Sequence, residues 1–278
     1  MIDTTIVSII LPTYNGAQFI AGAIESVLTQ TYPLWELIIV NDCSTDETKV
    51  IVEKYMAVDK RITLLENEYN LGIQKTINKG LQKTKGKYIA RIDDDDRWID
   101  TEKLSKQIRF LEENGEYVLI GTGGIIIDES EKELTRYLLP EKDSTIRNKI
   151  LSKNCFLHSS VVFKKEAVMK FNGYDESERT RHVEDYDLWL KIGTIGKFAN
   201  LPAYSVMLID REGSLTRRNS VLQAKHVLTD VVVFKKKYPR FLTGYFISVS
   251  RLLFFYFYEY IPFKKEVIYP LKKVYKKY

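Results

Sequence analysis

The sequence predicts an α/β fold in which a mostly parallel sheet carries helices on both faces. Up to about residue 125, short continuous apolar runs alternate with segments of helical periodicity. Polar clusters follow the apolar runs, where ligands bind in such sheets. The 278 residues are 45% hydrophobic and 28% charged, which is ordinary for a globular protein and excludes a disordered chain, a collagen or a multispanning membrane protein.

Four strands and three helices are expected in the first half. In chain order they are a strand at 6–12, a helix at 17–30, a strand at 35–42, a helix at 45–58, a strand at 61–67, a helix at 73–84 and a strand at 87–93. The helix at 45–58 begins within a Ser/Thr/Asp cluster that is typical of helix caps. Because strands separated by helices require crossover connections, they form a parallel sheet.

The pattern is less regular after residue 125. The expected elements are strands at 117–128 and 158–165, a helix at 183–193 and a longer helix at 220–238. There is no internal repeat and no low-complexity linker. We therefore expect one domain at 1–218, with halves at 1–125 and 126–218, and a C-terminal helical segment at 219–278.

Few residues suggest covalent or zinc chemistry. Cys43 and Cys155 do not make a disulfide framework, which favours a reducing compartment. His158 is expected to be a hydrogen-bonded residue at a strand edge rather than a metal ligand. The first residues lack a basic region and a cleavage site, so they are predicted to lead into the first strand rather than to form a signal peptide.

The C-terminal segment is basic and aromatic. From Lys235 onward there are eleven Lys/Arg and two Asp/Glu, a balance of +9, which leaves −4 for the rest because the whole chain carries +5. Residues 241–263 contain ten aromatic residues, but Arg251 and Glu259 would make a membrane crossing costly. We expect this segment to lie in the interface of an anionic membrane; a packed core helix with a solvated tail is the alternative. No nucleic-acid partner is expected. The basic residues of a nucleic-acid-binding protein should flank its binding site, whereas here they are concentrated in the C-terminal segment.

Four consecutive aspartates, Asp93 to Asp96, end the fourth strand. Their carboxylates repel one another at such short separations. In an extended chain Asp93 and Asp95 point to one side, where two oxygen ligands could bind Mg²⁺ or Mn²⁺. A solvated acidic loop is the alternative.

Three other polar stretches, 12–16, 41–46 and 67–72, also follow strands and should converge with the aspartates on one crevice. Asp42 ends the second strand. It could form a turn or cap the helix near Thr45, or it could accept a hydrogen bond from a uracil, thymine or guanine N–H. Neutral cytosine has no ring N–H to give, so if Asp42 contacts a base, a cytidine nucleotide such as CMP is not expected.

Two carboxylates, Glu184 and Asp185, precede or open the helix at 183–193. A carboxylate at a helix N-terminus is most often a cap. Asp187 and Lys191 are expected to be a surface i,i+4 pair of little consequence.

Three stretches together resemble family 2 glycosyltransferases of the GT-A fold, over about residues 6–215. They are VSIILPTYNGAQFIAGAIESVLTQTYPLWELIIVNDCSTDET, NLGIQKTINKGLQKTKGKYIARIDDDD and HVEDYDLWLK. The resemblance implies a Rossmann-like nucleotide-sugar-binding half at 1–125 and an acceptor-side half at 126–218. It also implies an inverting transferase that uses a nucleotide sugar and Mn²⁺ or Mg²⁺.

The resemblance also implies roles for single residues. Those matching the nucleotide-binding loops are Pro12, Thr13, Tyr14, Asn15, Asp42, Asn70 and Gly72. Asp93 and Asp95 match the DxD pair, with Asp95 as the direct metal ligand and Asp93 facing the ribose and phosphates. Asp185 matches the catalytic base, with Glu184 beside it.

Two positions depart from the family's pattern. Asp94 occupies the middle DxD position, where a small residue is usual. It is expected to contribute to nucleotide-sugar binding, and it leaves the choice of metal ligand open among Asp94, Asp95 and Asp96. Arg211 stands where a histidine is common, so it could hold the diphosphate but could not bind a metal ion.

The resulting expectation is an enzyme on the cytoplasmic face of the inner membrane, bound peripherally. It would move a hexose from UDP-glucose or UDP-galactose to a lipid-linked (undecaprenyl-diphosphate) oligosaccharide, forming a β-linkage in O-antigen or surface-polysaccharide synthesis. One alternative is a sugar nucleotidyltransferase, but PTYNGAQF lacks the Gly-rich, Arg-containing loop that it would need. The other is a non-catalytic, membrane-attached carbohydrate-binding protein, which a degraded acidic motif would favour; here the acidic residues are present.

Overall fold

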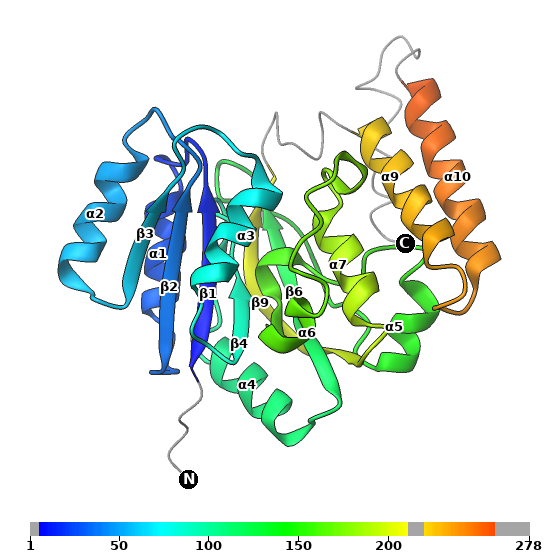
Figure 1. The fold of residues 1–278 in the computed structure, drawn as a ribbon, viewed down its shortest axis with the longest axis horizontal. Coiled ribbons are helices and arrows are strands. Elements are labelled where there is room, and N and C mark those ends of the chain that lie inside the picture. Colours follow the sequence, from blue (N-terminus) through cyan, green and yellow to red (C-terminus); the bar gives the residue numbers. More distant parts are fainter. Residues whose placement is uncertain (1–5, 211–219, 259–278) are drawn as a thin grey trace.

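The computed structural model describes residues 6–210 and 220–258. The expected alternation of strands and helices is present in the first half (Figure 1). Its elements are β1 (Val7–Thr13), α1 (Ile20–Leu28), β2 (Trp35–Asn41), α2 (Thr48–Val58), β3 (Ile62–Glu66), α3 (Ile73–Lys83) and β4 (Tyr88–Arg91). These strands pair in parallel in the order β3-β2-β1-β4, so their carboxyl ends share one edge of the sheet.

The second half extends the same sheet with a different pattern. Its elements are β5 (Arg97–Trp98), α4 (Lys103–Glu113), β6 (Tyr117–Ile127), β7 (Glu133–Tyr137), α5 (Asp143–Lys149), β8 (Val162–Lys164), α6 (Lys165–Met169), α7 (Glu184–Ile192) and β9 (Lys197–Ile209). Strand β8 joins β4 to β6 and is antiparallel to both, whereas β9 is parallel to β6. Every antiparallel pair involves a strand that follows β4.

Two local expectations for the second half are corrected. The strand expected at 158–165 is only three residues long, because a 3-10 turn at His158–Ser160 precedes it. Strand β9 was missed, since Pro202 lies within it and its register against β6 shifts on both sides of Gly123. A proline and an interrupted register hide the period-two pattern of a strand.

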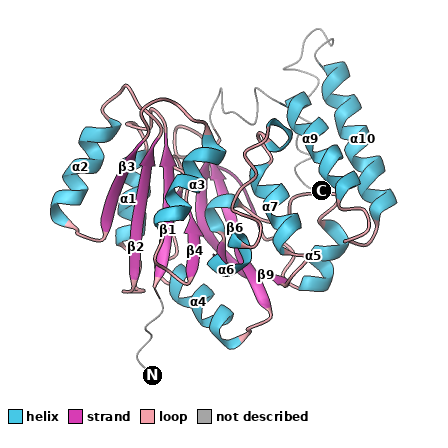
Figure 2. Ribbon diagram, viewed as in Figure 1, coloured by secondary structure: helices cyan, strands magenta, loops and turns pink. Residues whose placement is uncertain are grey.

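Helices cover both faces of the sheet (Figure 2). Alternate residues of β1 divide between two apolar cores: Ile10 packs with α3, α6 and α7, whereas Ile9 and Leu11 pack with α1, α2 and α4. Such burial on both faces explains why the strands are continuous apolar runs.

The two C-terminal helices, α9 (Ser220–Val233) and α10 (Phe241–Tyr258), lie side by side at the outer edge of the second half (Figure 1). The first is shorter than the expected 220–238, because turns follow Val233. Within the described residues, neither they nor any other helix combines the length and apolarity of a membrane span. The boundary predicted at 218/219 falls among residues 211–219, outside the described part, and stays a prediction.

Candidate active site

The loops that follow β1 and β2 are joined by hydrogen bonds at the carboxyl edge of the sheet. Asn15 donates its backbone N–H to Ser44 Oγ (2.9 Å) and accepts the N–H of Thr45 at its side-chain oxygen (2.8 Å). The N–H of Gly16 donates to Thr48 Oγ1 at 2.9 Å. The first two predicted polar stretches therefore form one unit.

The loop after β1 also binds the aspartate run. Thr13 donates its hydroxyl to Asp94 Oδ2 at 2.6 Å. A Cβ added at Gly16 would lie 2.3 Å from that oxygen and 2.5 Å from Thr13 Oγ1, so only glycine allows this close approach. Asp94 therefore joins the segment that follows β4 to the end of β1.

Asp42 is buried and fixes the loop after β3. Its Oδ1 accepts hydrogen bonds from the Asn67 side-chain amide (2.7 Å) and the Leu71 N–H (2.8 Å), and its Oδ2 accepts the Gly72 N–H (2.9 Å). A turn at this position was one alternative for Asp42, but it is the side-chain oxygen of Asn41 that accepts the N–H of Ser44. Asp42 thus connects β2 to the start of α3, with acceptor capacity left on Oδ2.

We expect Asp42→Asn to lower the free energy of unfolding by about 2 to 3 kcal/mol, because an amide cannot accept on both sides and one N–H donor would face an NH₂ group. Urea unfolding measures this loss, and the amides of Leu71 and Gly72 should exchange faster with solvent. Glu68→Gln in the same loop is the control, since Glu68 is exposed. Unchanged exchange at Leu71 and Gly72 would contradict the assignment.

A buried arginine holds the first aspartate of the run. Arg91 is 1% exposed and forms an ion pair with Asp93 at 2.5 Å, while its guanidinium also donates to the carbonyls of Ile10 and Ile92. Ser159 donates to the second oxygen of Asp93 at 3.2 Å. Burial opposes ionisation of Asp93, but the charge of Arg91 and the hydrogen bonds from Arg91 and Ser159 together lower the pKa of Asp93.

The aspartate run is a turn, which corrects the expectation of an extended chain. The N–H of Asp96 donates to the carbonyl of Asp93 at 3.2 Å, so the side chains at 93 and 95 do not share a strand face. Asp96 is buried, and its pKa is raised by that burial and by the charges of Asp95 and Asp93. The turn therefore brings the charges of Asp93 and Asp95 to act on Asp96.

The rings of His158 and Tyr174 pack together beside the Arg91–Asp93 ion pair. His158 Nε2 is 3.3 Å from Arg91 Nε and 3.0 Å from the Tyr174 hydroxyl, and its ring packs edge-on against Trp189 of α7. Burial and the charge of Arg91 lower the pKa of His158 to about 3, so this imidazole is neutral and accepts from Arg91. The predicted hydrogen-bonded role of His158 is confirmed.

The two predicted carboxylates open helix α7. Asp185 Oδ2 accepts a hydrogen bond from the Asn154 amide at 2.8 Å. Burial raises the pKa of Asp185, and the negative charge of Asp93 raises it further, which places the acidic turn within electrostatic reach. Burial and the charge of Asp185 raise the pKa of Glu184 to about 8. At neutral pH the Glu184 carboxyl is therefore mostly protonated.

The residues of the acidic turn suit a hard cation. Within residues 6–210 and 220–258, no group of three or more His, Cys, Asp or Glu side chains is arranged to hold a metal ion. Proteins, however, commonly bind Mg²⁺ through one or two carboxylates, with substrate phosphates and water completing the shell. The turn supplies such carboxylates. Burial, followed by the charges of Asp95 and Asp93, raises the pKa of Asp96, and a bound cation would reduce the repulsion between these carboxylates.

The remaining predicted residues differ in burial and in their position relative to this site. Pro12 is buried within β1, whereas Tyr14 and Asn70 are exposed beside the loops. Arg211 lies outside the described residues. Sequence reasoning missed Arg91 and Asn154, although a charged residue within the apolar run before the aspartates was a signal for Arg91.

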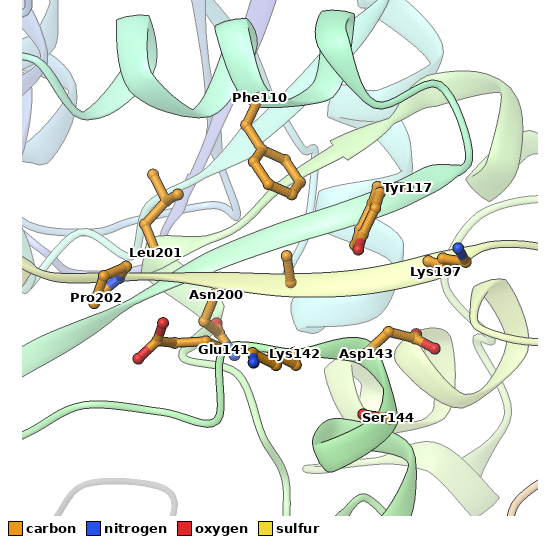
Figure 3. Close-up of a pocket in the computed structure, with 11 residues that line it drawn as sticks. Phe110, Tyr117, Glu141, Lys142, Asp143, Ser144, Lys197, Asn200, Leu201 and Pro202 are labelled. Carbon is orange, nitrogen blue, oxygen red and sulfur yellow. The ribbon is translucent and has the colours of Figure 1, made fainter.

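A hollow of about 510 Å³ lies elsewhere, at the amino ends of β6 and β9 (Figure 3). Phe110 and Tyr117 line it on one side, and Lys142 and Asp143 lie on the other. Because β6 and β4 run in the same direction, these ends lie at the opposite edge of the sheet from the aspartates. The hollow is therefore separate from the candidate active site.

Comparison with known proteins identifies the family. The model of the family described as "Glycosyl transferase family 2" matches residues 8–176. The Escherichia coli "UDP-Glc:alpha-D-GlcNAc-diphosphoundecaprenol beta-1,3-glucosyltransferase WfgD" is 38% identical over 191 residues, which are 68% of this chain and 70% of that protein. Three other curated relatives are matched over 66%, 59% and 64% of their lengths, so the chain spans about two thirds of such relatives.

Solved structures confirm the GT-A fold. S. aureus TarS 1-349 in complex with UDP-GlcNAc superposes with a TM-score of 0.70 at 19% identity, covering 94% of this chain and 77% of that one. Mannosyltransferase PcManGT from Pyrobaculum calidifontis, in complex with GDP-Man and Mn²⁺, gives 0.64 at 18% identity, covering 88% and 69%. With the family match and the WfgD identity, the chain belongs to glycosyl transferase family 2.

Proposed function

We propose that the protein transfers a hexose from a UDP-sugar, UDP-glucose or UDP-galactose, to a hydroxyl of an undecaprenyl-diphosphate-linked oligosaccharide and inverts the anomeric configuration. The observation that carries this proposal is the position of Asp185, a carboxylate of raised pKa within electrostatic reach of Asp93. The printed name of WfgD supports both the UDP donor and the lipid-linked acceptor class. The proposed product is a β-linkage within a surface polysaccharide such as O-antigen.

Asp185 acts as the general base. Its carboxylate takes the proton of the acceptor hydroxyl as that oxygen attacks the anomeric carbon from the face opposite the departing diphosphate. The Asn154 amide and the backbone N–H of Tyr186 donate to this carboxylate and hold it in place. A single in-line displacement converts an α-linked donor into a β-linked product, and excluding water limits hydrolysis of the donor.

Asp95 and Asp93 are the proposed ligands of Mn²⁺ or Mg²⁺. When bound, the cation supplies positive charge that neutralises the leaving diphosphate. Arg91 keeps Asp93 ionised and in place, while Asp94 stays with Thr13. Arg211 is proposed to contact the diphosphate.

The loops after β1 and β3 are proposed to bind the nucleoside. Asp42 offers its remaining acceptor position to the N3–H of uracil, and the exposed ring of Tyr14 is available for stacking on the base. Pro12 and Asn15 shape the first loop, and Asn70 the loop after β3. This arrangement favours UDP over CMP donors, because neutral cytosine has no N–H at that position.

The direct test measures UDP release from a panel of nucleotide sugars, with Mn²⁺, Mg²⁺ or EDTA, with and without a diphospholipid-linked saccharide acceptor. Acceptor-dependent release of UDP that EDTA abolishes is expected. A thermal-shift screen of the same panel identifies the donor, because a bound donor stabilises the folded state by mass action. Pyrophosphate release instead of UDP would support the nucleotidyltransferase alternative, and donor binding without turnover of any acceptor would support the carbohydrate-binding alternative.

We also propose that α10 lies on the anionic cytoplasmic face of the inner membrane. Four apolar residues at helical spacing are exposed on one side of it, and we name them the α10 stripe: Leu242 (65% exposed), Phe246 (64%), Leu253 (49%) and Phe257 (60%). The exposed residues Lys235, Lys236, Lys237 and Arg240 precede this helix. Apolar side chains beside basic ones are typical of a helix that binds an anionic membrane surface.

Replacing Phe246 and Leu253 together by serine should weaken co-sedimentation with phosphatidylglycerol-containing vesicles by at least about tenfold, because burying each apolar side chain contributes about 1.5 to 3 kcal/mol. Turnover of a water-soluble acceptor should stay unchanged. Val58→Ser is the matched control, since Val58 is 80% exposed but lies on α2, away from the stripe. Equal vesicle binding by all three proteins would refute this membrane surface.

A further inference from the structure

Residues 175–182, which we name the lead-in segment, connect Tyr174 to the start of α7. Apart from one 3-10 turn at Glu178–Thr180, the segment has no regular structure. His182 has a φ of +68°, a left-handed conformation that is uncommon outside glycine. The segment therefore depends on contacts from other elements for its position.

Helix α7 lacks a capping side chain at its N-cap position, because Val183 makes no side-chain capping hydrogen bond. Three acidic residues occupy the first turn, where negative charge suits the helix dipole, and the Asp185 carboxylate accepts the backbone N–H of Tyr186. Among the described residues, however, Glu184 Oε2 is buried without a hydrogen-bond partner. Contacts from outside the helix therefore help to set where α7 starts.

One face of α9 supplies such contacts. Gln223 donates its side-chain amide to the carbonyl of His182 at 3.1 Å, and His226 Nδ1–H donates to the carbonyl of Arg181 at 2.8 Å. Asp230 forms an ion pair with Arg179. Positions 223, 226 and 230 are three and four residues apart, so they lie on the same side of the helix.

Arg179 links α9 to α7, because it pairs with an aspartate on each helix. Its guanidinium pairs with Asp187 at 2.7 Å and with Asp175 at 3.0 Å, and Lys191 pairs with Asp187 at 2.7 Å. The expected i,i+4 pair of Asp187 and Lys191 forms, but its expected surface position is wrong, because Asp187 is fully buried, and so is Asp230. Local spacing suggested an exposed i,i+4 pair, but the packing of α9 closes over it.

The cluster has more acids than bases. Among residues 6–210 and 220–258, Asp175, Asp187 and Asp230 form ion pairs with two cations, Arg179 and Lys191. Burial and the neighbouring Asp187 charge raise the pKa of Asp230 to about 7. Replacing Asp230 by a neutral residue leaves two acids facing the two cations, so the change removes the ion pair that holds Arg179 and does not create an uncompensated charge.

We propose that α9 belongs to the active-site scaffold, and that Arg179, held by Asp230, is a positioning residue that sets the first turns of α7 through Asp187. The inference rests on the proposed function in one respect: it takes Asp185 as the general base. Arg179 does not touch the reacting atoms. It fixes the helix from which the base projects, so the C-terminal helices contribute to catalysis as well as to membrane contact.

The test compares Asp230→Asn with the wild-type full-length chain. We expect kcat to fall about tenfold, while the donor KM and the affinity for UDP stay within twofold. In hydrogen exchange by mass spectrometry, amides of residues 182–188 should exchange at least several-fold faster, with those of β1 to β4 unchanged. Val52→Ala, a buried change on α2, is the stability-matched control, and it should lower Tm without changing kcat or that exchange.

A second variant covers the case in which Asp230→Asn does not fold. Gln223→Leu removes only a neutral hydrogen bond to His182 and should show the same pattern at smaller amplitude. Lys225→Gln, on the exposed side of α9, should behave as wild type. Unchanged exchange at 182–188, or losses of kcat and exchange protection equal to those of Val52→Ala, overturns the proposal. The exchange result decides it even if wild-type protein transfers no sugar, an outcome that would refute only the proposed function.

Discussion

Asp185→Asn should lower sugar transfer by about 10²- to 10⁴-fold and leave UDP affinity unchanged, because the amide cannot take the acceptor's proton. The substitution keeps the shape of the side chain, and its carbonyl can still accept from the Asn154 amide. It also removes a charge whose burial is unfavourable, as the raised pKa of Asp185 indicates. Loss of activity would therefore not come from unfolding.

The matched control is Glu184→Gln, at the neighbouring position of the same helix. Because the pKa of Glu184 is raised to about 8, its carboxyl is protonated at neutral pH and an amide resembles it. We expect less than a tenfold loss of kcat. Steady-state kinetics of both variants, with calorimetric UDP binding, separate the two carboxyls. If Glu184→Gln were the inactive variant and Asp185→Asn the active one, the base assignment would be reversed.

Arg91→Met is expected to lower the free energy of unfolding by about 3 to 5 kcal/mol, the range for breaking a buried ion pair from one side. The guanidinium is fully buried and satisfies the carbonyls of Ile10 and Ile92 as well as Asp93. Methionine fills much of the volume but leaves these acceptors unpaired. Turnover should fall too, since Asp93 would lose the contact that orients it.

Urea unfolding of Arg91→Met and of the double variant Arg91→Met/Asp93→Asn measures the pair. The double variant should regain part of the lost stability, because it no longer carries an uncompensated aspartate, but it should regain none of the turnover. Lys87→Met tests for a general effect of losing a cation near β4, as Lys87 is exposed and pairs with Glu112. Its free energy of unfolding should change by less than about 1 kcal/mol. Equal losses from the two single variants would contradict the buried role of Arg91.

Sequence reasoning located the candidate site better than it described the contacts within it. Asp42 and Asp93 were placed at strand ends because apolar runs mark the strands of a parallel sheet. The partners of Asp42 lie 25 to 30 residues away along the chain, beyond any local pattern. The turn at Asp93 was missed because period-two alternation was extended past the last residue of β4.

Asp187 shows the same limit in the second half. The i,i+4 rule identified its neighbour Lys191, but burial was decided by Arg179 and Asp230, which approach from two other elements. Asp185 was separated from an ordinary helix cap only by resemblance to a family. Physical pattern alone cannot distinguish the two roles, because both place a carboxylate in the first turn of a helix.

Gln74 connects the two halves of the molecule. It lies in the first turn of α3, two residues after Gly72, and its side-chain amide donates to the carbonyls of Asp175 and Ser177 and to the Thr180 hydroxyl. The proposed nucleotide site at Asp42 and the proposed base on α7 are therefore linked through the side chain of Gln74. Under the proposed function, we expect the donor to bind before the acceptor.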